Sequence, residues 1–165
     1  MANSLSRTGK DIADIYNRHK DMVYRICFAY MKNSADTEDI IQEAFYQLIK
    51  TGATFVSDEH EKAWIIRTAT NLCKNNLRHW WRKRENIEDH EGLRARNDFE
   101  VDDTFKVVMS LPDKYKTVVY LYYYEGYDSV EISKILNKPQ STIRYFLSNA
   151  RKILRDKLGG DFSEE

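Results

Sequence analysis

Residues 128–158 read DSVEISKILNKPQSTIRYFLSNARKILRDKL. Asp128 and Glu131 have the spacing of a capping box, which predicts the start of a short helix. The residues NKP at 137–139 predict a tight turn, and helical spacing of apolar residues predicts a longer helix over 140–158. A short helix, a tight turn and a longer basic helix form a helix-turn-helix, whose second helix enters the major groove of DNA.

The longer predicted helix has an apolar face and a polar face. The residues expected to pack inward are Ile143, Leu147, Ala150 and Leu154. The side chains expected to point outward are Ser141, Arg144, Tyr145, Ser148 and Lys152. Gln140 and Ser141 are expected nearest to the base edges, where Arg144 can read guanine and Gln140 can read adenine. A plain three-helix bundle with a charged face is the alternative, and the turn, the caps and the polarity argue against it.

Helical spacing also dominates the first half of the chain. A first helix of about 20 residues is predicted around residues 12–30. Ser34 is expected to cap a second helix, which Gly52 ends. Asp58 and Glu61 predict a capping box at the start of a third helix, which runs through Arg84. The apolar stripe expected on the second helix is Ile40, Ile41, Ala44, Phe45, Leu48 and Ile49.

The stretch LPDKYKTVVYLYYYEGY at 111–127 is ambiguous, because Val and Tyr favour strands. Pro112 near its start, Gly126 near its end and the helical neighbours favour a helix. Residues 85–103 are charged and poor in large apolar side chains, which is typical of a linker. We therefore expect an all-α protein of two small helical domains, over 8–85 and 105–160, joined by an acidic linker over 86–104.

The charge of the chain is balanced overall but divided along the sequence. Lys plus Arg and Asp plus Glu number 26 each in 165 residues. Residues 62–84 hold seven basic residues and no acid, and 134–157 hold seven basic residues and one acid. Between them, 85–103 hold eight acids and two Arg. Two basic segments separated by an acidic one indicate nucleic-acid binding that the net charge conceals.

Cysteine and histidine usage argues against a metal site. Cys27 and Cys73 have no CxxC spacing and no clustered His, so reduced thiols are expected rather than a disulfide framework or a zinc site. No metal and no cofactor are expected. The amino terminus lacks an apolar signal region, and no apolar run approaches membrane-spanning length. We therefore expect a cytoplasmic protein without membrane insertion.

The third predicted helix carries a basic face opposite an apolar one. The residues expected to face a core are Ile65, Ile66, Ala69, Leu72, Cys73 and Leu77. The opposite face is Arg67, Asn71, Lys74, Arg78 and Arg82, with Trp81 one turn past Arg78. Cations suit phosphates, amides suit base edges and an indole can stack on a base, which is the mixture that single-stranded nucleic acid needs. A solvated basic face with Trp80 and Trp81 in the core is the equal alternative; of the pair, Trp80 is the expected core residue.

The second predicted helix carries the opposite charge. Its acids are Asp36, Glu38, Asp39 and Glu43, and no basic residue occurs between Lys32 and Lys50. Carboxylate pairs can catalyse reactions or hold metal ions, but no convergent His and no second acidic cluster accompany these. A protein interface or a solvated surface is therefore expected, and no catalytic residue.

Three segments in this order resemble a known family. DTEDIIQEAFYQL (36–48) is similar to the polymerase-binding motif of bacterial sigma factors of the sigma-70 family. WIIRTATNLCKNNLR (64–78) is similar to the helix that in this family melts and reads the −10 promoter element. LPDKYKTVVYLYYYEGYDSVEISKIL (111–136) with STIRYFLSNARKILRDKL (141–158) resembles the region that binds the −35 element. The two-domain layout resembles the short extracytoplasmic-function subgroup.

The polar faces of the predicted helices and the resemblance together predict three sets of site residues. The members that the resemblance itself carries over are Asp36, Asp39, Gln42, Glu43, Asn71, Thr142, Arg144 and Arg151. Those that would bind the coiled coil of the polymerase β′ subunit are Asp36, Glu38, Asp39, Gln42 and Glu43. Those that would bind −10 DNA are Arg67, Asn71, Lys74, Asn75, Arg78, Trp81 and Arg82. Those that would bind −35 DNA are Gln140, Ser141, Thr142, Arg144, Tyr145, Ser148, Arg151 and Lys152. In addition, the loop from Ala53 to Glu61 matches one that captures a flipped −10 base.

The resemblance also implies partners and a mechanism. The partners are core RNA polymerase through its β′ and β subunits, promoter DNA and an anti-sigma factor, and the protein itself would catalyse nothing. The sequence departs from the family at Phe146 and Asn149, where basic residues are common. It also has Lys138-Pro139 where Ile-Ser is usual.

Two other classes of function compete with this interpretation. A free-standing transcriptional regulator would bind duplex DNA as a dimer through the helix-turn-helix. It would leave the first domain as an oligomerisation or sensing module, and the basic face of the third helix without a role. An enzyme acting on nucleic acid is the third class, and the sequence holds no catalytic constellation for it.

Overall fold

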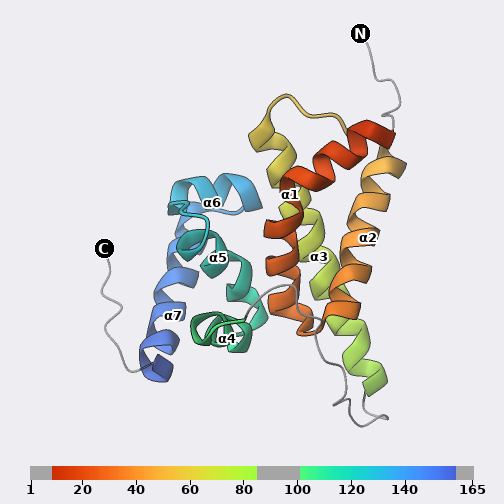
Figure 1. Cartoon of the computed structure of the whole chain (residues 1–165). Coiled ribbons are helices and arrows are strands. Elements are labelled where there is room, and N and C mark those ends of the chain that lie inside the picture. Colours follow the sequence, from red (N-terminus) through yellow and green to blue (C-terminus); the bar gives the residue numbers. More distant parts are fainter. Residues whose placement is uncertain (1–8, 85–100, 159–165) are drawn as a thin grey trace. The chain divides into compact units, whose positions relative to one another are not determined.

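A computed structural model describes residues 9–84 and 101–158 of the 165-residue chain. The described residues form seven α-helices and no strand, so the all-α class expected from the sequence is confirmed. The chain divides into two compact units (Figure 1). The first contains α1 (Gly9–Met31), α2 (Ser34–Thr51) and α3 (Asp58–Arg84). The second contains α4 (Asp103–Ser110), α5 (Asp113–Tyr123), α6 (Ser129–Leu136) and α7 (Gln140–Leu158).

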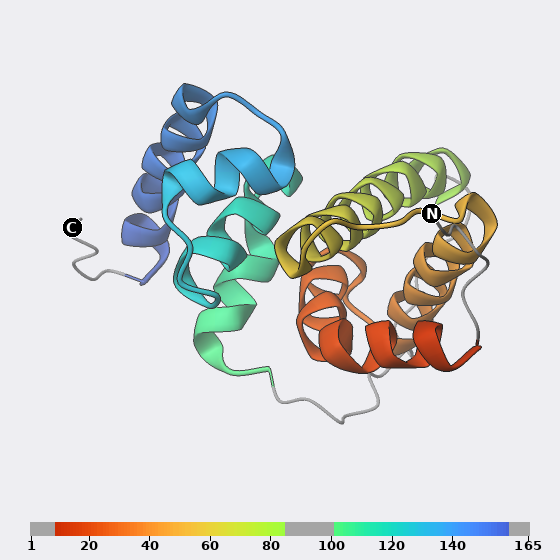
Figure 2. The same cartoon turned by 90° about the horizontal axis from the view of Figure 1, so that it is seen from above.

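The three helices of the first unit contact one another pairwise and lie around a shared apolar core (Figure 2). The side chains with at most 1% exposure include Val23, Ile26 and Cys27 of α1, Leu48 of α2, and Ile65, Ile66, Ala69 and Cys73 of α3. Full burial of one such aliphatic side chain stabilises a fold by ~1.5–3 kcal/mol. The inward face expected for α3 is therefore confirmed in its centre, while Leu72 and Leu77 are only half-buried.

Helix α2 begins one residue earlier than the sequence suggested. The cap is Asn33, whose side chain accepts a hydrogen bond from the backbone N–H of Asp36 at 2.8 Å. The Asn33 amide also donates to the Asp36 carboxylate at 2.8 Å, so the cap residue and the first turn are joined by two reciprocal hydrogen bonds. Ser34 is already helical, and its expected role as the cap is wrong. Gly52 ends the helix at φ 64°, in the left-handed region that favours glycine, as expected.

Helix α3 begins without the expected capping box. The hydroxyl of Ser57 accepts a hydrogen bond from the His60 N–H at 3.1 Å, and the Ser57 carbonyl accepts from the Glu61 N–H at 3.1 Å. Ser57 therefore accepts hydrogen bonds from backbone N–H groups of the first turn, and it takes the capping role expected of Asp58. The Glu61 side chain is left available for partners outside α3, and it pairs with α1.

The ambiguous segment of the second unit is helical. Helix α5 starts after Pro112 and ends at Tyr123, so the neighbours and the proline outweigh the strand preference of its Val and Tyr residues. Helix α4 was not foreseen. Its cap, Asp102, accepts from the Phe105 N–H at 2.8 Å, so the last two residues of the expected linker, 103 and 104, are helical. Residues 85–100 of that linker lie outside the described ranges.

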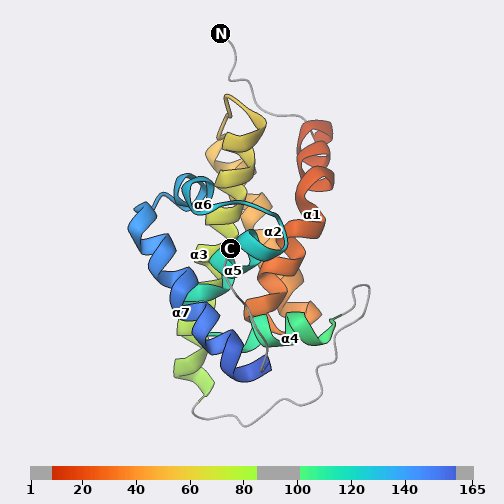
Figure 3. The same cartoon turned by 90° about the vertical axis from the view of Figure 1, so that its left-hand side faces the viewer.

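The helix-turn-helix forms as the sequence predicts. Asp128 and Glu131 make both bonds of the capping box at the start of α6. Asn137 ends α6 with φ 57°, and Pro139 precedes α7. In Figure 3, α6 lies near the start of α7 and α4 near its end. The unit closes over apolar side chains of at most 2% exposure, among them Val118 and Leu121 of α5, Ile132 of α6, and Ile143, Leu147 and Ala150 of α7.

Among the helices described, none is long and apolar enough to span a bilayer.

Candidate nucleic-acid interface

The outer face of α7 carries the side chains that the sequence placed there. All five residues expected to point outward are exposed: Ser141, Arg144, Tyr145, Ser148 and Lys152. Tyr145 is the most exposed aromatic residue of this face, at 61%. The opposite side of the helix buries Ile143, Leu147, Ala150 and Leu154. The arrangement is that of a recognition helix with cationic, hydroxyl and aromatic groups on one surface, and the contact of these residues with DNA stays a prediction.

Three other candidates for −35 recognition are half-buried: Gln140, Thr142 and Arg151. The Gln140 amide donates to the Ser129 hydroxyl at 3.2 Å, which ties the first residue of α7 to the first residue of α6. The guanidinium carbon of Arg151 lies 5.7 Å from the ring centroid of Tyr122 on α5. Burial lowers the pKa of Arg151, but hydrogen bonds with Tyr123 and Tyr122 outweigh it and raise the pKa. Gln140 and Arg151 therefore both make contacts within the unit that the sequence did not reveal.

Two of the positions at which the resemblance predicts other residues, Phe146 and Asn149, face α5. The ring of Phe146 meets that of Tyr115 with centroids 5.5 Å apart, edge to face. The Asn149 amide donates to the Tyr115 hydroxyl at 3.2 Å. Both side chains are half-buried against this tyrosine, so neither belongs to the exposed face of α7. Their apolar and amide character suits packing better than a basic side chain would.

The basic face of α3 is only partly exposed. Asn71, Asn75 and Arg78 are exposed, and Arg78 donates to Asn75 at 3.3 Å. Arg67 and Lys74 are half-buried and make contacts of their own. Helix α3 continues through Arg84, but the side chains of Trp80, Trp81 and Arg82 lie outside the described part of the chain.

The acidic face of α2 is exposed except at its first residue. Glu38, Asp39, Gln42 and Glu43 are exposed, whereas Asp36 is half-buried in the cap that it forms with Asn33. The face continues into two exposed apolar residues, Tyr46 at 55% and Ile49 at 58%. The expected inward position of Ile49 is wrong, because Phe45 and Leu48 fill the core at this end of α2 and Ile49 lies beyond the edge of their stripe.

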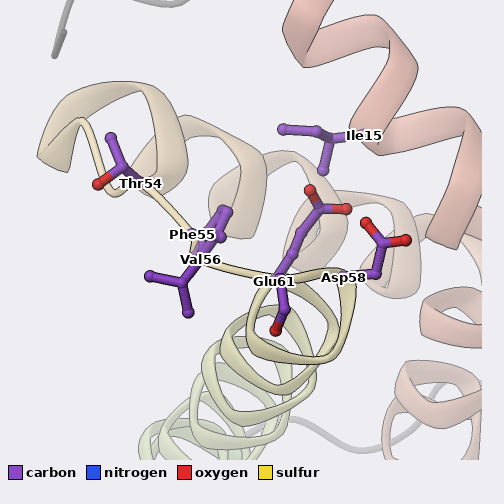
Figure 4. A pocket seen from close by; sticks show the side chains of 7 residues that line it. Ile15, Thr54, Phe55, Val56, Asp58 and Glu61 are labelled. Carbon is purple, nitrogen blue, oxygen red and sulfur yellow. The ribbon is translucent and has the colours of Figure 1, made fainter. Parts of the chain in front are cut away.

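An open pocket of about 450 Å³ lies beside the loop between α2 and α3 (Figure 4). It is lined by Ile15 of α1, by residues 54–57 of the loop, and by Asp58 and Glu61 of α3. The carboxylates of Asp58 and Glu61 point toward the Ile15 side (Figure 4).

The loop beside this pocket is held onto α3 by aromatic and backbone contacts. The Phe55 ring lies 5.2 Å from His60 and 6.0 Å from Trp64, centroid to centroid. The Val56 N–H donates to Nδ1 of His60 at 3.2 Å, while the Val56 side chain is 90% exposed. The site therefore combines a fixed loop backbone with an accessible apolar tip and an acceptor-rich wall.

Glu61, which lines the pocket from α3, also binds two side chains of α1. Its carboxylate accepts hydrogen bonds from Arg18 at 2.9 and 3.2 Å and lies 2.7 Å from Nε2 of His19. The hydrogen bonds to Glu61 raise the pKa of the Arg18 guanidinium above its ordinary value. The sequence does not reveal these partners, because Glu61 has a spacing that a capping box explains equally well.

Comparison with known proteins matches each unit to a family. The model of Sigma-70 region 2 matches residues 15–84, and that of Sigma-70, region 4, matches residues 106–154. The chain is 30% identical to the ECF RNA polymerase sigma factor SigW of Bacillus subtilis, over 90% of this chain and 87% of that protein. It is 28% identical to the RNA polymerase sigma factor SigV of the same organism, over 85% of this chain and 86% of that protein.

A solved structure shares the fold. The sigma factor RpoE, in complex with the anti-sigma factor NepR from Bartonella quintana, superposes with a TM-score of 0.72 at 16% identity. The match covers 92% of this chain and 99% of that chain. The α2, α3, α6 and α7 surfaces described above lie almost wholly within the two matched regions. The chain belongs to the sigma-70 family of RNA polymerase sigma factors, in its extracytoplasmic-function group.

Proposed function

We propose that this chain divides the work of a sigma factor among three surfaces: α7 for the −35 element, α3 with the adjoining loop for the −10 element, and α2 for core RNA polymerase. As a member of its family, the chain directs promoter-specific initiation of transcription by RNA polymerase. The residues of each surface are assigned from their exposure, their charge and their match to the family motifs.

The exposed face of α7 carries the proposal. Arg144 lies near the start of the recognition helix, where a guanidinium can bind guanine through two hydrogen bonds. Lys152 lies two turns later, where an ammonium suits the phosphate backbone. Gln140 is reassigned: because its amide is bonded to Ser129, we assign it to fixing the angle between α6 and α7 rather than to reading adenine.

The acidic face of α2 is the proposed polymerase surface. Asp39, Gln42 and Glu43 are exposed on one side of the helix. Tyr46 and Ile49 extend the same surface by about two turns and supply apolar area, which a purely solvated face would not need. Asp36 is assigned to the helix cap first, since both its backbone and its carboxylate are bonded to Asn33.

The exposed face of α3 and the loop pocket are the proposed −10 surface. Asn71, Asn75 and Arg78 offer amides and a cation to a single strand. The pocket beside residues 54–57 is open and about 450 Å³ in volume, which suits a single base removed from the stack. Unstacking costs a few kcal/mol per base, and capture of the base in the pocket would offset it.

The remaining roles follow from this division of work. We propose that the chain is not itself an enzyme and that it acts in the cytoplasm, where core polymerase and promoter DNA are found. We also propose an anti-sigma factor as a regulatory partner. The structurally similar RpoE is bound to one, and the exposed apolar residues of α2 are a surface that an inhibitor could cover.

Transcription with purified core bacterial polymerase and a library of promoters tests the proposal. A defined set of transcripts that requires both polymerase and this chain is the expected result. The Arg144→Ala variant is the internal control, because it should change which −35 sequences are used. Dimeric binding of the chain alone to duplex DNA, without polymerase-dependent transcripts, would instead favour the free-standing regulator. Chemical conversion of nucleic acid by the chain alone would favour an enzyme.

A further inference from the structure

One nearly buried carboxylate ties α1 to the start of α3. Glu61 is 6% exposed, and the Arg18 guanidinium binds both of its oxygens. His19 is also buried, and its Nε2 lies 2.7 Å from Oε2 of Glu61. A buried carboxylate is tolerated when its charge is matched and its lone pairs are used, and these two side chains do both. Glu61 is not needed to cap the start of α3, because the Ser57 hydroxyl already accepts a hydrogen bond from the first turn of that helix.

The same tie lies at the edge of the loop pocket. Glu61 lines the pocket from α3 and Ile15 lines it from α1. Ile15 and Arg18 are three residues apart on α1 and so lie on one side of the helix. The Arg18–Glu61 pair therefore fixes the α1 wall of the pocket against the α3 wall. Arg18 itself is not among the lining residues.

We propose that Arg18, supported by His19, is a positioning residue for this pocket. By fixing Glu61, it holds the two walls at the separation that admits one unpaired base of a DNA strand. This inference rests on the proposed role of the pocket in capturing a −10 base. Arg18 acts through Glu61 and does not contact DNA. The planar guanidinium suits this role, because two parallel bonds fix an orientation that a single ammonium bond leaves free.

The test compares the affinity for an intact −10 strand with the affinity for the same strand lacking one base. Holoenzyme is reconstituted from core polymerase and the full chain, and its affinity for single-stranded −10 oligonucleotides is measured. Each position is replaced in turn by an abasic site, so that the ratio of the two affinities reports the binding of that base alone. Thr54→Phe, which fills the pocket, identifies the captured position, because it should abolish the ratio there. Stacking energies lead to an expected ratio of about tenfold for wild type.

At the captured position, Arg18→Gln should reduce the ratio to near one, and Arg18→Lys should leave an intermediate value. Lys20→Gln is the matched control, since it removes an exposed charge from the same helix two residues away and should keep the wild-type ratio. Partial unfolding of a variant lowers both affinities equally and leaves the ratio unchanged, so a loss of stability cannot imitate the expected result.

Two results would overturn the inference. If a position responds to Thr54→Phe but keeps its ratio in Arg18→Gln, the pocket captures a base without the help of Arg18. An equal loss of affinity for both strands in Arg18→Gln also leaves the ratio unchanged and belongs to this case. If no position responds to Thr54→Phe, the proposed role of the pocket fails, and the inference fails with it.

Discussion

Asn149 of α7 donates a hydrogen bond from Nδ2 to the hydroxyl of Tyr115 on α5, over 3.2 Å. Phe146, one turn earlier on α7, packs against the ring of the same tyrosine. These are the two positions at which the resemblance predicts basic residues and the chain has none. Because Tyr115 engages both, this side of α7 serves the packing of the unit. The surface of α7 left for DNA is therefore narrower than it would be with basic side chains at these two positions.

We expect Tyr115→Phe and Asn149→Ala each to lower the free energy of unfolding by ~1 kcal/mol, the usual net value of one hydrogen bond. The double variant should cost less than the sum, because both changes remove the same bond. Denaturant unfolding followed by circular dichroism measures this. Duplex affinity of the folded variants should equal that of wild type. Weaker duplex binding by Asn149→Ala at unchanged stability would place this side chain on DNA.

Arg144→Ala should relax the preference for one or two −35 positions, at a cost of ~1–3 kcal/mol for the preferred base. Lys152→Ala should weaken binding about equally across sequences and reduce the slope of log affinity against log salt by about one unit. Both residues are exposed on α7, so neither change should alter the fold. Binding to a randomised −35 duplex, measured at several salt concentrations, separates the two effects. If Arg144→Ala also weakens all sequences equally, it is a phosphate contact.

Charge reversal at Asp39 and Glu43, both to Lys, should weaken binding to core polymerase and leave the melting temperature nearly unchanged. Exposed acids contribute little to stability, whereas reversed charges oppose a cationic partner. A pull-down with core polymerase measures affinity. Asp21→Lys, an exposed acid on α1, is the control for a general effect of charge. If the double variant and wild type bind core polymerase equally well, the acidic face of α2 is not part of the polymerase interface.

The double variant Asn71→Ala, Trp81→Ala should bind polymerase normally but transcribe poorly from duplex promoters, because these side chains are proposed to meet bases exposed by melting. A template with a mismatched −10 bubble should restore transcription in part, since the unstacking cost is then absent. Permanganate footprinting of thymines near the start site measures melting directly. If a folded double variant gives the same footprints as wild type, the α3 face has no role in melting and is only a solvated surface. Thermal melting of Trp81→Ala alone shows whether that side chain belongs to the core.

The thiols of Cys27 and Cys73 should resist alkylation in the folded protein even at alkaline pH. Both are fully buried, and a hydrogen bond with Cys73 together with burial raises the pKa of the Cys27 thiol well above its usual range. Less thiolate therefore forms at Cys27 at any given pH, and burial alone shields Cys73. Since the unfolded chain ionises at its ordinary pKa of ~8.5, the stability contribution of this group is complete below that pH and falls above it. Rapid labelling by iodoacetamide without denaturant would contradict this.

The sequence was most informative where several local signals agreed. The capping box of Asp128 and Glu131, the turn at Asn137 and the apolar spacing of α7 all specify the same helix-turn-helix, and the structure contains it with the expected bounds. The outward side chains of α7 followed from the same periodicity. No distant contact was needed to place any of these features.

The sequence was less informative where a distant partner competes with a local role. Glu61 has capping-box spacing, but two side chains of α1 bind its carboxylate and Ser57 replaces it at the helix end. Ile49 is apolar, yet it is 58% exposed, because it lies beyond the edge of the stripe that Phe45 and Leu48 bury. Asn33 and Ser34 are both good caps, and the bond to Asp36 decides between them. Such choices depend on tertiary contacts that periodicity does not encode.

The apolar end of α2 should make the proposed polymerase interface less sensitive to salt than the proposed promoter interface. Attraction between basic side chains and phosphates weakens steeply as ionic strength rises. Salt also weakens the attraction of the α2 acids, but burial of Tyr46 and Ile49, which are 55% and 58% exposed in the free chain, does not depend on charge. During osmotic stress, when a cell concentrates its ions, the chain should therefore leave promoters before it leaves the polymerase. It would retain its share of the enzyme against competing initiation factors and resume transcription as soon as the cytoplasm is diluted again.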